Sequence, residues 1–164
     1  MKLDRYKTGA STYKQTTICY LVKDNQILLA MKKRGFGVNW WNGAGGKVKE
    51  GESTEEGAIR ETTEEINVIP TSMEKIAILN FHLPDKQDLN VQTHVYRVTK
   101  WQGEPTESEE MAPRWFDLSE IPYDQMWDSD RIWMPKFLEG KPFTANFLYK
   151  GEDKLVEYEF TDNL

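Results

Sequence analysis

The chain has 164 residues, of which 38% are apolar and 12% aromatic, the size and composition of one domain with a hydrophobic core. A formal net charge of −6 and an isoelectric point near 5.1 exclude a surface that binds nucleic-acid backbone through excess positive charge, so we expect no nucleic-acid polymer as a partner. No stretch approaches the roughly 20 apolar residues of a membrane span, and we expect no membrane partner. The single cysteine, Cys19, cannot form an intramolecular disulfide, and a reducing, cytoplasmic location is expected.

The N-terminal part of the chain is predicted to contain an arm and a hairpin. Residues 1–15 are polar and are expected to form a loosely held arm, followed by a single domain over residues 16–164. Residues 16–22 and 26–32 are predicted to pair as a hairpin, because a polar turn separates two apolar runs. The glycine-rich connection at residues 35–46 contains two adjacent tryptophans, which favour a functional loop over a disordered one.

A helix is predicted from Ser53 to about Ile66. Ser53 and Glu56 have the spacing of a capping box, in which each side chain accepts a hydrogen bond from the other residue's backbone N–H. Ala58, Ile59 and Ile66 are expected to face the core, with the acidic cluster facing away from it. Pro70 prevents the helix from extending much further.

The rest of the chain is predicted to alternate between strands and helices. In order, these are strands at 75–83 and 91–100, a short helical piece at 117–121, a helix at 129–138, and hairpin strands at 143–149 and 155–160. Such alternation predicts an α/β fold, an α+β sandwich in which helices flank a mixed β-sheet.

An acidic cluster, Glu61, Glu64 and Glu65, lies on the predicted helix. Because each helical residue advances by about 100°, these three positions share one face. Crowded carboxylates repel one another, and divalent cations between them remove that repulsion. We therefore expect Mg²⁺ as cofactor, with Mn²⁺ able to substitute, since such cations hold phosphate oxygens and lower the pKa of an attacking water. A solvated acidic helix face is the alternative interpretation.

Two neighbouring features have expected roles beside the acidic cluster. Gly45 and Gly46 have no side chain, so the backbone can approach a ligand closely and offer a carbonyl to a metal. Arg60 cannot bind a cation and is expected to orient Glu52 or Glu61 through a charge-assisted hydrogen bond.

The chain resembles the Nudix hydrolases, which cleave nucleoside diphosphates linked to another moiety, in one long gapped pattern: Gly46-x5-Glu52-x7-Arg60-Glu61-x2-Glu64-Glu65. Two positions depart from the family pattern. Thr62 replaces an aliphatic residue, and Asn67 replaces a glycine. Asparagine tolerates the left-handed conformation better than most residues, so Asn67 is expected to end the helix as glycine would. The resemblance implies the Nudix fold, a mixed sheet flanked by helices.

Further segments, at residues 31–37, 41–43, 107–111, 115–116 and 126–127, are similar in order and nearly in spacing to the MutT-related branch, whose members hydrolyse oxidised purine nucleoside triphosphates. This resemblance covers roughly residues 16–160. It implies attack of water on the β-phosphorus, with release of a monophosphate and pyrophosphate, and a role in sanitation of the nucleotide pool. It also implies metal ligands at Gly45, Glu61, Glu65 and Glu110. Glu64 or Glu65 would act as general base or hold a further metal, and the choice between them stays open.

The same resemblance implies a pocket for a purine base. Asn42 would hydrogen bond to the edge of the purine, and Thr17 and Lys32 would line the pocket. Four side chains would contact the face of the purine: Phe36, Phe81, Met111 and Trp127. The complete set of expected substrate-binding residues is Thr17, Lys32, Phe36, Asn42, Phe81, Met111, Trp127, Ser129 and Asp130.

Ser129 is the most consequential departure from the family pattern. The relatives carry two aspartates after the tryptophan; Asp130 matches the second, whereas Ser129 replaces the first. A carboxyl group accepts hydrogen bonds and, when protonated, also donates one, but a serine hydroxyl is shorter and stays neutral. We expect an altered or narrowed base preference, with 8-oxoguanine, 2-oxoadenine, a methylated purine and an ordinary purine all open as the preferred base.

Three functions are open at this stage. The first is hydrolysis of a purine nucleoside triphosphate by a monomer. The second is hydrolysis of dinucleoside polyphosphates or capped RNA ends, and the third is non-catalytic nucleotide sensing. Loss of a carboxylate from the pattern would favour a sensor, and all of the carboxylates are present.

Overall fold

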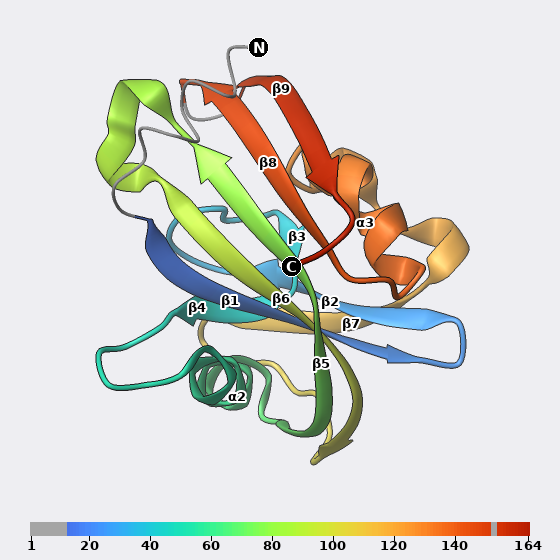
Figure 1. Cartoon of the computed structure of the whole chain (residues 1–164). Coiled ribbons are helices and arrows are strands. Elements are labelled where there is room, and N and C mark those ends of the chain that lie inside the picture. The colour runs from blue at the N-terminus through green and yellow to red at the C-terminus, as the bar shows by residue number, and fades with distance from the viewer. Residues whose placement is uncertain (1–12, 152–153) are drawn as a thin grey trace.

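The computed structural model describes residues 13–151 and 154–164, and in these residues nine strands form one mixed β-sheet (Figure 1). The strand order is β3-β2-β1-β6-β5-β8-β9, with β4 paired to β1 and β7 paired to β2. β1 and β6 are parallel, as are β5 and β8, and the other pairs are antiparallel. The mixed sheet and the helices of the described residues confirm the predicted fold class.

The strands are β1 (Lys14–Lys23), β2 (Gln26–Lys32), β3 (Trp41–Asn42), β4 (Ala44–Lys47), β5 (Ile69–His82), β6 (Val91–Gln102), β7 (Met111–Asp117), β8 (Phe143–Lys150) and β9 (Lys154–Thr161). The helices are α2 (Thr54–Ile66) and α3 (Asp130–Leu138), with short 3₁₀ turns η1 (Pro84–Leu89), η2 (Leu118–Glu120) and η3 (Tyr123–Gln125). Among these, no helix has the length and apolar character needed to cross a membrane.

The predicted first hairpin is confirmed. β1 and β2 are antiparallel, with Lys23 opposite Gln26. The two residues between them, Asp24 and Asn25, have φ angles of 49° and 64°, the left-handed conformations that a two-residue turn of type I′ requires. β1 starts at Lys14, however, because its first residues pair with β6. The last two residues of the predicted arm therefore belong to the sheet, and residues 1–12 lie outside the described residues.

The structure also contains strands that the sequence did not predict. β3 and β4 lie inside the glycine-rich connection, and β7 precedes the predicted helical piece at 117–121, which is η2 in the structure. β5 begins at Ile69 and not at 75, and the polar segment between the two predicted strands forms the turn η1. β3, β4 and β7 are extended because neighbouring strands supply their hydrogen-bond partners, which local composition does not reveal.

Helix α2 forms as its caps predict. The Ser53 side chain accepts a hydrogen bond from Glu56 N–H at 3.1 Å, and the Glu56 side chain accepts one from Ser53 N–H at 3.4 Å. Asn67 ends the helix with a φ of 61° and donates its N–H to the carbonyl of Thr63. The capping box and the left-handed asparagine end are thus both confirmed.

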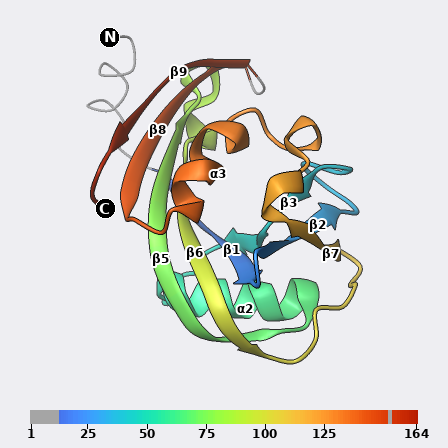
Figure 2. The ribbon, with the colours of Figure 1, turned by 90° about the vertical axis from the view of Figure 1, so that its right-hand side faces the viewer.

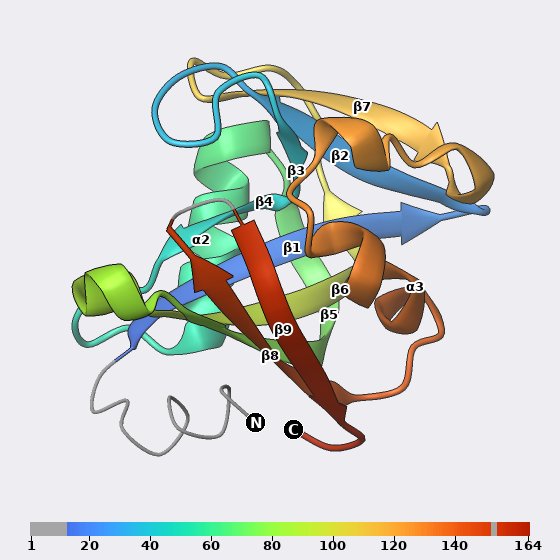
Figure 3. The ribbon, with the colours of Figure 1, turned by 90° about the horizontal axis from the view of Figure 1, so that it is seen from above.

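The two helices pack on opposite faces of β1 (Figures 2 and 3). Cys19 and Leu21 point toward α2, whereas Tyr20 points toward α3, as strand alternation requires. The α2-side cluster comprises Cys19, Leu21, Leu28, Ala30, Ala44, Ala58, Ile66, Val68, Tyr96, Val98 and Met111. The α3-side cluster comprises Tyr20, Ile27, Leu29, Trp41, Ile76, Ala77, Leu79, Val95, Met126, Trp133, Met134, Phe137, Phe143, Ala145, Phe147 and Tyr149.

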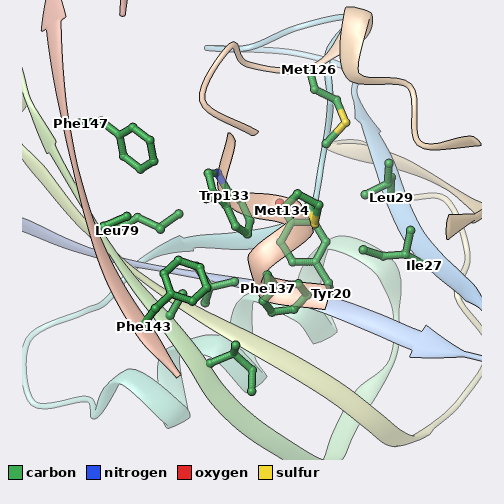
Figure 4. Close-up of a cluster of buried hydrophobic side chains, with 14 of the residues drawn as sticks. Tyr20, Ile27, Leu29, Leu79, Met126, Trp133, Met134, Phe137, Phe143 and Phe147 are labelled. Carbon is green, nitrogen blue, oxygen red and sulfur yellow. The ribbon is translucent and has the colours of Figure 1, made fainter. Parts of the chain in front are cut away.

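Helix α3 is fixed by large buried side chains. Figure 4 shows Trp133, Met134 and Phe137 of α3 within the α3-side cluster, with strand residues such as Leu29 and Leu79 around them. Burial of each such side chain stabilises the fold by about 1.5–3 kcal/mol. The first residues of α3 are therefore held in a defined position relative to β1.

Candidate active site

The acidic cluster on α2 is divided between the surface and the interior. Glu64 is exposed, but Glu65 is only 5% exposed, and the Gly45 N–H donates to its Oε2 at 3.4 Å. The expectation that the acidic residues all face away from the core is therefore wrong for Glu65. It follows Ala58 and Thr62 by seven and three positions, which places it on the same buried face of the helix.

The glycine pair allows α2 and β1 to approach β4 closely. A Cβ atom on Gly46 would lie 2.6 Å from the carboxyl carbon of Glu61. A Cβ atom on Gly45 would collide with the backbone of Thr17. A side chain at either position would therefore displace β1 or a carboxylate of the cluster.

Arg60 contacts both glutamates that the sequence indicated. Its Nε and Nη2 donate to the two carboxylate oxygens of Glu52 at 2.8 and 2.9 Å, and its Nη1 donates to Glu61 Oε1 at 2.9 Å. These hydrogen bonds lower the pKa of Glu52 to about 2. Arg60 thus fixes the orientation of the Glu61 carboxylate through a charge-assisted hydrogen bond.

The pKa of Glu65 is raised to about 8, chiefly by burial. The negative charges of Glu61 and Glu110 raise it further, whereas Lys32 and the Gly45 N–H lower it. The structure therefore brings Glu61, Glu65 and Glu110 into one electrostatic environment. That environment disfavours the ionised form of Glu65 and would favour an added cation.

Glu110 is already paired with cations of the protein. Arg34 donates to its Oε1 from Nη2 at 2.8 Å and from Nε at 3.2 Å, and Lys32 Nζ lies 3.5 Å from its Oε2. Sequence reasoning missed Arg34. Within the described ranges, no three aspartate, glutamate, histidine or cysteine side chains converge closely enough to hold a metal as they stand. The donor types present, carboxylates and a glycine carbonyl, nevertheless fit a hard divalent cation.

Aromatic residues gather around Trp127. Its ring stacks on Phe36, with centroids 5.2 Å apart, and on Trp40, with centroids 5.6 Å apart. Phe36 is 76% exposed and so offers a large aromatic surface to solvent. The sequence indicated Phe36 and Trp127, but it did not distinguish Trp40 from the other core or surface aromatic residues.

Ser129 and Asp130 are buried at the start of α3, with exposed fractions of 1% and 5%. Asp130 Oδ1 accepts a hydrogen bond from Trp133 Nε1 at 3.0 Å, whereas Asp130 Oδ2 and Ser129 Oγ make no hydrogen bond of standard geometry among the described residues, although the Trp127 backbone N–H lies near the Asp130 carboxyl and the Tyr149 hydroxyl lies near Ser129. An unsatisfied buried polar group costs about 1–3 kcal/mol, so both atoms are suited to a ligand. Burial also raises the pKa of Asp130 to about 7.

The other expected substrate-binding residues fall into two groups. Lys32 lies beside Glu110, and its positive charge lowers the pKa of Glu65. Thr17 lies two positions before Cys19, on the strand face that packs against α2, and its Oγ1 also has no partner in the described part of the chain. Met111, which the resemblance places against the face of the purine, is buried and belongs to the α2-side cluster.

The remaining two residues lie toward α3. Phe81 stacks on Phe147 with centroids 5.4 Å apart and adjoins Tyr149. Burial raises the pKa of Tyr149, while the neighbouring Ser129 lowers it and the charge of Asp130 raises it further. Asn42, at the end of β3, accepts a hydrogen bond from the hydroxyl of Tyr20. The candidate site thus has a carboxylate end beside α2 and an aromatic end beside α3.

A family model described as the NUDIX domain matches residues 12–137. The chain belongs to the Nudix family. The Nudix pattern spans the glycine pair and α2, so α2 is its Nudix helix. Both departures from the pattern are accommodated, since Thr62 is buried as an aliphatic residue would be, and Asn67 adopts the left-handed conformation of a glycine.

Two Nudix relatives are similar over nearly their whole length. The "Oxidized purine nucleoside triphosphate hydrolase" of Danio rerio is 40% identical over 151 residues, which cover 92% of this chain and 96% of the relative. The protein of the same name from Mus musculus is 38% identical over 152 residues, covering 93% and 97%. The crystal structure of a mutator MutT protein from Bacillus halodurans has the same fold, with a TM-score of 0.78, 24% identity, and coverage of 92% and 99%.

Proposed function

We propose that this Nudix hydrolase cleaves oxidised purine nucleoside triphosphates to the monophosphate and pyrophosphate, and so removes damaged precursors from the nucleotide pool. The observation that carries the proposal is the two-ended site. The buried Glu65 marks a carboxylate end suited to phosphates, and the unpartnered atoms of Ser129 and Asp130 beside Trp127 mark an aromatic end suited to a base. Two relatives that match more than nine-tenths of the chain are named for this activity.

Mg²⁺, for which Mn²⁺ can substitute, is the proposed cofactor, held by Glu61, Glu65, Glu110 and the carbonyl of Gly45. When bound, such a cation neutralises phosphate charge and lowers the pKa of a bound water. The raised pKa of Glu65 supports this assignment, because burial and, after it, the charges of Glu61 and Glu110 disfavour the ionised carboxylate, which a bound cation would stabilise. Arg34, now paired with Glu110, would give up this partner.

The protein's own groups then position and deprotonate the attacking water. Arg60 keeps Glu61 oriented through its short hydrogen bond. The general base is Glu65 or Glu64, and their environments differ: Glu65 is buried, whereas Glu64 is exposed and lies 3.4 Å from Arg60. Lys32, next to Glu110, has the charge to hold phosphate oxygens.

At the aromatic end, the purine would stack on Trp127 and Phe36, with Phe81 at the side of the pocket. Asn42, Ser129 and Asp130 supply hydrogen-bonding groups for its edge. Thr17 and Met111 lie toward the carboxylate end, which suits contacts with the sugar and phosphates.

Water labelled with ¹⁸O tests the reaction class. With 8-oxo-dGTP and Mg²⁺, attack on the β-phosphorus places the label in pyrophosphate and leaves the monophosphate unlabelled. Cleavage of diadenosine tetraphosphate or capped RNA without cleavage of triphosphates would favour the second Nudix function. Tight nucleotide binding without any cleavage would favour the sensor.

Ser129 is expected to narrow the base preference. We expect kcat/KM for 8-oxo-dGTP and 2-oxo-dATP to differ by at least about tenfold, because one buried hydrogen bond that is lost costs about 1–3 kcal/mol. Ser129→Asp restores a second carboxyl group and should reduce this difference. Ser119→Asp adds the same charge at an exposed position and serves as control. Equal turnover of both nucleotides by the wild type would contradict the expectation.

Arg60→Gln is expected to lower kcat by about 10- to 100-fold, the usual cost of removing a group that orients a metal ligand. The change removes the hydrogen bonds to Glu52 and Glu61 but leaves the aromatic end intact, so KM should change less than kcat. Steady-state kinetics at varied Mg²⁺ measure both constants. Arg131→Gln, which breaks a surface ion pair with Asp124, is the matched control; a kcat equal to that of the control would refute the assigned role.

A further inference from the structure

We propose that Tyr20 is a specificity-determining positioning residue, whose buried hydroxyl fixes the Asn42 side-chain amide so that the pocket presents N–H donors to the base. The inference rests on the proposed function, since it concerns recognition of the base at that site. It assigns a role to a residue that neither the Nudix pattern nor the expected pocket includes.

Two hydrogen bonds determine the orientation of the Asn42 amide. The backbone N–H of Gly43 lies 2.8 Å from Asn42 Oδ1, and the Tyr20 hydroxyl lies 3.1 Å from the same atom. A backbone N–H can only donate, so the side-chain atom facing it must be the carbonyl oxygen. Both lone pairs of that oxygen are then occupied.

The Tyr20 hydroxyl is itself held in place. The residue is fully buried, and its ring packs on Trp133 and Phe137 with centroids 5.9 and 5.5 Å apart. Burial, followed by the charge of Asp130, raises the pKa of the Tyr20 hydroxyl well above its ordinary value. The hydroxyl therefore stays protonated and available as a donor to Asn42 at any pH used for an assay.

The opposite side of the amide is left for a ligand. Among the residues that the structure describes, none accepts a hydrogen bond from Asn42 Nδ2. Its N–H groups match a purine edge that carries an acceptor, such as a carbonyl oxygen or an unprotonated ring nitrogen. An amino group at that edge would place donor against donor. The substrate class is thus a purine that directs an acceptor toward Asn42.

A double-mutant cycle tests the proposal. We compare the wild type, Tyr20→Phe, Asn42→Ala and the double variant in cleavage of 8-oxo-dGTP and in binding of 8-oxo-dGMP. Tyr20→Phe removes one oxygen atom and keeps the ring. We expect KM and the monophosphate Kd to rise about 3- to 10-fold, as for loss of one hydrogen bond, with kcat within about twofold of wild type. In the Asn42→Ala background the same change should have almost no effect, because Tyr20 acts through Asn42.

Tyr96→Phe is the matched control. Its hydroxyl is also buried within the fold, but it hydrogen bonds to Thr54 and Glu55 at the start of α2, away from the aromatic end. KM for 8-oxo-dGTP should stay at its wild-type value in this variant. A rise equal to that of Tyr20→Phe would show a general loss of packing and would overturn the proposal.

NMR of the wild type provides a test that does not depend on any variant folding. The side-chain ¹⁵NH₂ resonances of Asn42 should shift when 8-oxo-dGMP is added, because these protons gain an acceptor. The role of Tyr20 would be overturned if the Asn42 resonances did not shift at saturating 8-oxo-dGMP. It would also be overturned if the effects of Tyr20→Phe and Asn42→Ala on binding were fully additive. Failure of the wild type to cleave any purine triphosphate would instead overturn the proposed function, and the cycle would then be decided by monophosphate binding alone.

Discussion

Glu65→Gln is expected to lower kcat for pyrophosphate release by about 10³-fold or more, within the range for loss of a general base or of metal-assisted activation. Glutamine keeps the size of the side chain but removes its charge and its basicity. Because Glu65 is buried beside Gly45, no nearby carboxylate can take its position without moving the helix. Steady-state kinetics with 8-oxo-dGTP and Mg²⁺ measure the loss.

The same substitution should change the pH dependence of stability in the metal-free protein. The pKa of Glu65 is about 8 in the folded state, well above its ordinary value of 4.5. The folded state therefore holds this proton more tightly than the unfolded state, and stability falls as pH rises from about 4.5 toward 8. Glu65→Gln should remove this fall, so that its Tm exceeds that of the wild type at pH 8 without metal.

Glu50→Gln, which neutralises an exposed glutamate before α2, is the control for charge alone. It should leave both kcat and the pH dependence of Tm at wild-type values. Wild-type activity in Glu65→Gln would contradict a catalytic or metal-binding role for this residue. Loss of activity in Glu64→Gln but not in Glu65→Gln would assign the chemistry to the exposed glutamate.

Asp130→Asn is expected to lower kcat/KM for the preferred nucleotide by about 100-fold, mostly through a higher KM. The reason is that the amide replaces one carboxyl oxygen by an NH₂ group, so a buried hydrogen bond to the base is lost. The aspartate has a pKa of about 7, so it changes from donor to acceptor within the assay range. Wild-type KM should therefore change across pH 7. Asparagine does not titrate, and the inflection should disappear in the variant.

The sign of the pH effect on stability follows from the same raised pKa. Neutral Asp130 is favoured in the buried site, so its contribution to stability is complete below about pH 4 and is lost as pH rises through 7. Asp130→Asn should thus be the more stable protein at pH 8. Asp128→Asn, at an exposed neighbouring position, is the control. An unchanged KM profile in Asp130→Asn would contradict contact between this residue and the base.

The parts of the fold that the sequence predicted depend on local signals. Ser53, Glu56 and Asn67 define both ends of α2 because capping is decided by side chains within one turn of the helix. The strands β3, β4 and β7 were missed, because their conformation comes from pairing with β1 and β2. Pairing of that kind depends on residues far away in sequence.

In the candidate site, too, the sequence predicted local contacts but not contacts between separate elements. The spacing of the glutamates and Arg60 on α2 predicted which groups meet along one helix, and the structure brings Arg60 to Glu52 and Glu61. Contacts between separate elements were not predictable, such as Arg34 with Glu110. For Tyr20, one signal was present: a hydroxyl at an inward-facing position within the apolar run of residues 18–22 needs a polar partner.

The most direct test is pyrophosphate release by the wild type from equal concentrations of 8-oxo-dGTP, 2-oxo-dATP, O6-methyl-dGTP, dGTP and dATP in the presence of Mg²⁺. Hydrolysis of one modified purine triphosphate at least about tenfold faster than dGTP and dATP is the predicted result, since a pocket with buried hydrogen-bonding groups discriminates by that much or more. Equal rates on all five nucleotides would contradict recognition of a damaged base at Asn42, Ser129 and Asp130.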